Sequence, residues 1–180
     1  MDELELSVRC SRGDRLAYKE LYNTYADLLL GICYRYVGDA DIANDLLHDG
    51  FIKIFTSINT FHYRDKGSLR AWMTRIMVNT ALEYLRKNKK LDYMDDMEKF
   101  DESENDFDEQ NFRSVPEEII LKFVTELSPT TRSVFNLHIF EDMTHSEIGR
   151  FLGIKETASR MRLNRARKEL SEKINNYVRR

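Results

Sequence analysis

Apolar residues recur at three- and four-residue intervals along most of the chain, the spacing that places one face of an α-helix against a core. One such run begins at Asp14, a good N-cap residue, and stops at Gly38. A second run with this apolar spacing begins near Asp39, and a third begins at Ser68. We therefore predict a bundle of three or four helices over residues 1–91.

The second half of the chain contains three helix-start signals in succession. Ser114 and Pro116 predict an N-cap and an early helical proline for a helix through Leu127. The Ser128–Pro129 pair directly after it is the same signal and predicts the start of a further helix. At residues 144–147 the sequence T-H-S-E is a capping box, so another helix is expected to begin there.

The stretch from Asp142 to Leu170 has the length and punctuation of a helix-turn-helix, with a turn at Leu152–Gly153 before a long basic helix. If Leu163 faces the core, the opposite face of that helix is polar and basic, as in a helix that reads the DNA major groove. A helical hairpin with a solvated basic face is the alternative. The candidate DNA contacts are Thr157, Arg160, Met161, Asn164, Arg165 and Lys168.

Composition supports an all-α fold. The 180 residues include only 7 Gly and 2 Pro, too few for a turn-rich β-sandwich or barrel. Cys10 and Cys33 lack metal-ligand or redox spacing, and the chain opens with the acidic MDELEL, so we expect a reducing, cytoplasmic compartment. No apolar stretch approaches the roughly 20 residues of a membrane span.

Charge is segregated along the chain. Residues 62–90 and 155–180 each carry six net positive charges, whereas residues 92–109 hold ten acidic residues against Lys99, a net charge of −9. Like charges repel, so the acidic stretch predicts a disordered tether between two basic, nucleic-acid-binding domains. A solvated helical surface with a loop would explain the charges equally well.

The loop FHYRDKG, residues 61–67, and the helix after it mix aromatic with basic side chains. This mixture suits the stacking of unpaired bases while cations follow a phosphate backbone. Trp72 belongs to the mixture, but a single tryptophan is more often a core residue, so we expect it to be partly structural. The candidate contacts to melted DNA are Phe61, Tyr63, Arg64, Lys66, Arg75 and Arg86.

A short acidic ladder, Asp41, Asp45 and Asp49, lies at four-residue spacing and suits a basic partner surface. Using two of these carboxylates as a general acid and base is the weaker interpretation, because no pocket glycines or nucleophile motif accompany them. The four histidines are scattered without metal-ligand spacing. We therefore expect no enzyme activity, no metal and no cofactor.

Taken in order, the three stretches resemble a bacterial RNA polymerase sigma factor of the extracytoplasmic-function class. The resemblance implies a promoter-melting region 2 at residues 1–91, an acidic flexible linker at 92–113, and a region 4 helix-turn-helix at 114–180. It gives the acidic ladder a partner, the clamp helices of core RNA polymerase, and it makes residues 61–67 the loop that receives a flipped base of the minus-ten element. The core-binding residues would be Asp45, Leu46, His48, Asp49, Phe51 and Lys53. The resemblance also adds Asn79 to the contacts with the minus-ten element.

By the same resemblance, region 4 reads the minus-thirty-five element of promoter DNA and touches the polymerase flap. The chain would be a monomer when free and could have an anti-sigma protein as a further partner. It departs from the family pattern at His48, at Glu83 and at residues 155–158, where the recognition helix begins. A dimeric helix-turn-helix regulator and a helical adaptor for protein partners are the rival interpretations.

Overall fold

The computed structural model describes residues 2–88, 90–91 and 115–179, and all regular structure within these ranges is helical. The all-α prediction is confirmed. By its internal contacts the chain divides into two compact units, residues 1–84 and 85–180, a division that falls in the last turn of α4. The expected linker, residues 92–113, and the cap residue Ser114 lie outside the described residues.

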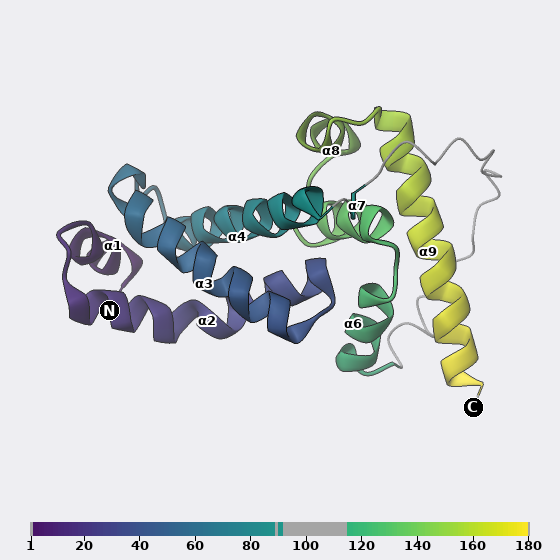
Figure 1. Ribbon diagram of the computed structural model, residues 1–180, viewed down its shortest axis with the longest axis horizontal. Coiled ribbons are helices and arrows are strands. Elements are labelled where there is room, and N and C mark those ends of the chain that lie inside the picture. Colours follow the sequence, from purple (N-terminus) through teal and green to yellow (C-terminus); the bar gives the residue numbers. More distant parts are fainter. Residues whose placement is uncertain (1, 89, 92–114, 180) are drawn as a thin grey trace. The chain divides into compact units, whose positions relative to one another are not determined.

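The first unit is a bundle of four helices, and Figure 1 shows three of them running alongside one another with the first across one end. They are α1 (Glu3–Ser11), α2 (Arg15–Val37), α3 (Ala40–Ser57) and α4 (Ser68–Lys87), with a 3-10 turn, η1 (Ile58–Thr60), after α3.

The ends of α2 and α3 follow the local signals in the sequence. Asp14 accepts hydrogen bonds from the N–H groups of Leu16 and Ala17, and Asp39 caps α3 in the same way. Gly38 ends α2 in the left-handed conformation, at φ 71°, which glycine adopts without a steric penalty. The predicted boundaries of these helices are confirmed.

The core of the first unit lies where α2, α3 and α4 meet. Tyr22 of α2 packs against Phe51 of α3 with ring centroids 4.6 Å apart. Gly50 allows α3 to approach α4 closely, because a Cβ atom there would lie 2.2 Å from the sulfur of Met77. Cys33 is a free, buried thiol 4.0 Å from the same sulfur, and burial raises its pKa to about 12.

The second unit consists of α6 (Glu117–Thr125), α7 (Pro129–Ile139), α8 (His145–Leu152) and α9 (Glu156–Val178). The long helix α9 packs against each of the other three, and Figure 1 shows them spaced along its length. Its buried face includes Leu163, Ala166, Leu170 and Ile174, the period expected when Leu163 faces the core.

The boundaries of α6 differ from the sequence prediction. Pro116 is the N-cap rather than an early helical residue, and the helix ends at Thr125 instead of reaching Leu127. The last turn tightens, since the N–H of Glu126 bonds to carbonyls three and four residues back. Ser128 must be extended because it precedes Pro129 and caps α7, so α6 has to stop before it.

Candidate functional site

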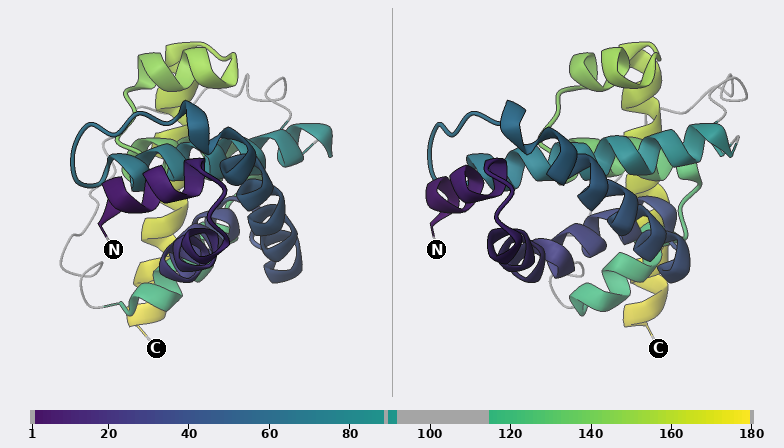
Figure 2. Two further views of the ribbon diagram at one scale, coloured as in Figure 1. Left: turned by 90° about the vertical axis from the view of Figure 1, so that its left-hand side faces the viewer. Right: turned by 60° about the vertical axis from the view of Figure 1, so that its left-hand side comes forward.

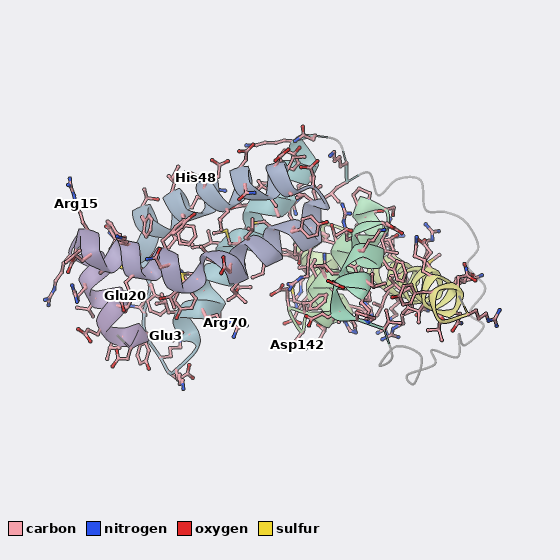
Figure 3. All side chains as sticks on the ribbon, turned by 90° about the horizontal axis from the view of Figure 1, so that it is seen from below. Glu3, Arg15, Glu20, His48, Arg70 and Asp142 are labelled. Carbon is pink, nitrogen blue, oxygen red and sulfur yellow. The ribbon has the colours of Figure 1, made fainter. Side chains whose placement is uncertain are left out.

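The outer face of α3 carries the acidic ladder. Asp41, Asp45 and Asp49 are exposed together with His48, which Figure 3 shows projecting from the helix. Ile52 lies on the same face and is 58% exposed, although the sequence analysis did not select it. Eleven residues separate Asp41 from Ile52, almost a whole number of helical turns. The face thus combines negative charge with one exposed apolar side chain.

Two other predicted core-binding residues face the interior of the bundle. Leu46 is 4% exposed and Phe51 is 3% exposed, so both help to hold α3 in place. Lys53 is half-buried and links α3 to α4, because its Nζ donates to Thr80 Oγ1 at 3.1 Å and to Glu83 Oε2 at 2.7 Å. Any contact of these three residues with a partner stays a prediction.

The loop at residues 61–67 presents its central side chains to solvent. Tyr63, Arg64 and Lys66 are exposed, whereas Phe61 is half-buried with its ring centroid 5.4 Å from that of Trp72. Trp72 is itself half-buried, in keeping with a partly structural role. The loop is therefore attached at Phe61 and projects between there and the start of α4.

Three predicted DNA contacts of α4 share one face of that helix. Arg75 and Arg86 are exposed and Asn79 is half-buried, with four- and eleven-residue separations that bring them into line. The basic loop ends at residue 67 and α4 begins at Ser68, so the loop leads directly into the helix that carries this basic face. The arrangement suits a nucleic-acid strand that follows the loop and then the helix.

The polar face of α9 is available as predicted. The side chains of Thr157, Arg160, Asn164 and Lys168 are exposed, and those of Met161 and Arg165 are half-buried. Arg160 pairs with Glu156 one turn earlier, N to O 2.5 Å, which pre-orients its guanidinium at low energetic gain because both groups are solvated. The first four turns of α9 thus present the residue types that contact bases and phosphates.

Local interactions hold both ends of α8. The capping box is present: Thr144 accepts from the N–H of Glu147, and the Glu147 carboxylate accepts from the N–H of Thr144. These hydrogen bonds hold the pKa of Glu147 below its ordinary value. Gly153 ends α8 at φ 73°, and the N–H of Ile154 bonds back to the carbonyl of Gly149.

Two histidines that the sequence analysis treated as scattered meet in the helix-turn-helix. The rings of His138 and His145 stack with centroids 4.7 Å apart and planes 9° from parallel. His145 Nδ1 lies 2.9 Å from Ser159 Oγ, which ties the start of α8 to the first turn of α9. His138 lies in α7 and His145, seven positions later, is the first residue of α8, so the periodicity of a single helix gives no sign of the contact.

Nowhere in the described ranges do three or more potential metal-ligating side chains gather. None of the helices that the structure describes is long and apolar enough to cross a bilayer. The geometry so far is that of a helix-turn-helix DNA-binding protein with a second, basic and aromatic surface on a separate bundle.

Comparison with known proteins finds a family match in each of the two units. Residues 21–91 match the family model of sigma-70 region 2, and residues 117–170 match that of sigma-70 region 4. The ECF RNA polymerase sigma factor SigW of Bacillus subtilis is 25% identical over 173 residues, 91% of either chain. The ECF sigma-E factor of Haemophilus influenzae is 28% identical over 176 residues, 92% of either chain.

Among solved structures, CnrH in complex with the cytosolic domain of CnrY resembles the fold, with a TM-score of 0.50 and 20% identity over 93% of each chain. The chain belongs to the sigma-70 family, as an ECF RNA polymerase sigma factor. It acts with core RNA polymerase to direct transcription initiation at promoter DNA. A stand-alone helix-turn-helix regulator would give the first half of the chain no role. The region 2 match over residues 21–91 gives it one, and so favours the sigma factor over the regulator.

Proposed function

We propose that the exposed face of α3 docks on the clamp helices of core RNA polymerase. Asp45, His48 and Asp49 would supply the polar contacts, and Ile52 would supply an apolar anchor at the C-terminal end of the surface. Most binding energy at an interface comes from a few desolvated side chains, while complementary charge steers the encounter. The exposed acidic ladder on α3, within the region 2 match, is the observation that carries this proposal.

The loop at residues 61–67 and the basic face of α4 hold the melted minus-ten element. Stacking contributes about 1–3 kcal/mol per captured base. Opening duplex DNA costs about 1.4 kcal/mol per base step. A few stacked bases, together with phosphate contacts from Arg64, Lys66 and Arg75, therefore offset the opening of a short bubble.

The second unit fixes the upstream register. The first four turns of α9 lie along the major groove of the minus-thirty-five element, with Asn164 and Arg165 at base edges and Arg160 and Lys168 at phosphates. The same unit touches the polymerase flap. The domain roles then follow the chain: region 2 at residues 1–91, a tether at 92–113 that sets the spacing, and region 4 at 114–180.

The chain works without catalysis of its own, as a specificity subunit in the cytoplasm where RNA polymerase acts, and is a monomer when free. The structural relative CnrH was solved with the cytosolic domain of CnrY, and on that analogy an anti-sigma protein is a further proposed partner.

Co-elution with core polymerase tests the docking face. Asp49→Arg reverses the charge at an exposed site of α3, and we expect the affinity for bacterial core RNA polymerase to fall about tenfold or more on a sizing column. Asp27→Arg is the matched control, because it makes the same charge change at an exposed position of α2 in the same unit. It should co-elute as the wild type does.

Far-UV circular dichroism of both variants verifies that the helices persist. A folded Asp49→Arg protein that still co-elutes stoichiometrically with core polymerase would remove α3 from the interface. If the wild type elutes alone and binds duplex DNA as a dimer, the regulator interpretation would replace this one.

A further inference from the structure

The helix α1 lies outside the residues that match region 2, yet it contacts the loop of that region. The match begins at residue 21, and α1 spans Glu3–Ser11. Figure 2 shows α1 beside the segment that connects α3 to α4, and Figure 3 places Glu3 at this end of the bundle. The helix also packs against η1, the turn just before the loop.

The Glu3 carboxylate bridges two elements of the first unit. Its Oε2 accepts a hydrogen bond from the backbone N–H of Gly67 at 2.7 Å, and its Oε1 accepts one from the Tyr25 hydroxyl at 3.0 Å. Burial and the neighbouring carboxylate raise the pKa of Tyr25 to about 12, so its hydroxyl keeps its proton and remains a donor. One carboxylate thereby ties α1, α2 and the end of the loop together.

The Glu3 carboxylate binds the loop at a residue with an unusual backbone conformation. Gly67 has φ +96°, a conformation that side-chain-bearing residues rarely adopt. Gly67 lies within a turn in which Ser68 Oγ donates to the carbonyl of Asp65 and accepts from the N–H of Arg64. With Phe61 held against Trp72 at the other end, both ends of the exposed segment 62–66 are fixed.

We propose that Glu3 is a positioning residue for promoter recognition: through Gly67 it holds the loop in the shape that receives a base of the melted minus-ten strand. The inference rests on the proposed function of that loop. It assigns a role in DNA specificity to a residue that is not part of the helix-turn-helix and that lies 64 positions before its loop partner in the sequence.

The N-cap of α1 is supplied by a residue other than Glu3. Asp2 is the N-cap of that helix, since its carboxylate accepts from the N–H of Glu5 at 2.7 Å. Buried hydrogen bonds to a charged acceptor are shorter and stronger than neutral ones. The carboxylate of Glu3 is therefore directed to the loop and to Tyr25, and removal of this group should loosen the loop before it unfolds the helix.

The first experiment measures amide hydrogen exchange at Gly67 by NMR in the full chain. In Glu3→Ala the N–H of Gly67 loses its acceptor, and exchange should accelerate about tenfold or more. Glu3→Gln keeps a carbonyl oxygen that can accept this bond, so its rate should lie near the wild type, and Tyr25→Phe should be intermediate. Glu5→Ala, in the same turn of α1 but with its carboxylate near Arg9, is the matched control.

The second experiment measures base preference in the holoenzyme. Wild type and variants are reconstituted with bacterial core RNA polymerase, and a library of promoters randomised in both elements is transcribed and sequenced. Glu3→Ala should co-elute with core normally but lose about tenfold of its preference for the favoured minus-ten base. Its minus-thirty-five preference should be unchanged, which a general loss of folding would not produce.

Equal Gly67 exchange in Glu3→Ala and Glu5→Ala would overturn the inference, as would an unchanged minus-ten preference in Glu3→Ala. The loop variant Tyr63→Ala separates the two levels of the proposal. If it loses the preference while Glu3→Ala keeps it, only the role of Glu3 falls. If Tyr63→Ala also keeps it, the loop does not read bases, and the proposed function of the loop falls together with this inference.

Discussion

The stacked pair His138 and His145 shows how single side chains hold the helix-turn-helix. His138 Nδ1 lies 2.9 Å from the carbonyl of Met143, in the segment before α8, and His145 Nδ1 lies 2.9 Å from Ser159 Oγ at the start of α9. The two rings therefore connect α7, α8 and α9 through interactions that neutral imidazoles can make. A proton added to either ring places a cation against the other.

The stability of the second unit should depend on pH through His145. Burial, the neighbouring His138, and the cations Arg160 and Arg167 lower the pKa of His145, against the opposing effect of Glu156. The folded state then binds fewer protons than the unfolded chain, in which histidine has a pKa of about 6.5. The free energy of unfolding should therefore fall as the pH drops below about 6.5, with the full loss reached below the lowered pKa of the folded state.

Urea unfolding of the wild type and His145→Asn at pH values of about 5 and about 7.5 measures this effect on either side of the histidine pKa. His145→Asn should show a smaller difference between the two pH values, because the residue that titrates is gone. His62→Asn is the control, since His62 is an exposed residue of the first unit. An equal pH dependence in wild type and His145→Asn would contradict the assignment.

At the scale of elements, the turn between α8 and α9 depends on a close backbone approach at Gly149. A Cβ atom at this position would lie 2.8 Å from the carbonyl oxygen of Ile154, and backbone cannot yield as a flexible side chain does. Gly149→Ala should therefore lower the free energy of unfolding by about 1–3 kcal/mol. It should also weaken binding to minus-thirty-five DNA, because α9 would be displaced from α8.

Chemical denaturation and a promoter-binding titration measure the two effects. Gly31→Ala serves as the control, because Gly31 lies inside α2 and a Cβ built there meets nothing within 4 Å beyond the neighbouring residues and backbone of its own helix. That variant should gain about 0.5–1 kcal/mol from the higher helix propensity of alanine. If Gly149→Ala is as stable as Gly31→Ala, the close approach does not constrain the turn.

The elements that could be predicted from the sequence are those whose signals are local. Asp14, Gly38 and the capping box at Thr144 each act within four residues, so their effects are visible in the printed chain. The contact of Glu3 with Gly67 joins residues 64 apart, and no local pattern marks it. Likewise, the acidic ladder indicated the exposed face of α3, and helical spacing also places Ile52 on that face. The packed bundle then shows that Leu46, a predicted core-binding residue, points inward.

At the scale of the whole molecule, the sign of the net charge differs between the two segments with proposed DNA contacts and the segment that joins them. The two segments that carry the proposed DNA contacts, 62–90 and 155–180, are each positive by six charges, and residues 92–109 carry −9 between them. Electrostatic forces act over about 8 Å at physiological ionic strength, so such a run interacts strongly only with cationic groups close to it. A positively charged nucleic-acid channel of the polymerase would supply those groups.

We predict that the acidic run acts as a nucleic-acid mimic that growing RNA must displace. Replacing the ten acidic residues of 92–109 by serine should reduce abortive products relative to full-length transcripts, because the displaced segment is held less tightly. The affinity of the chain for core polymerase should fall as well, and the difference in affinity between the wild type and the serine variant should narrow as salt is raised.

Run-off transcription with gel analysis of short products measures the ratio of abortive to full-length transcripts. A variant with serine in place of Asn105, Gln110 and Asn111 is the uncharged control. If abortive synthesis and promoter escape are the same with and without the acids, the charge of the linker has no part in escape, and its contribution is confined to the spacing between regions 2 and 4.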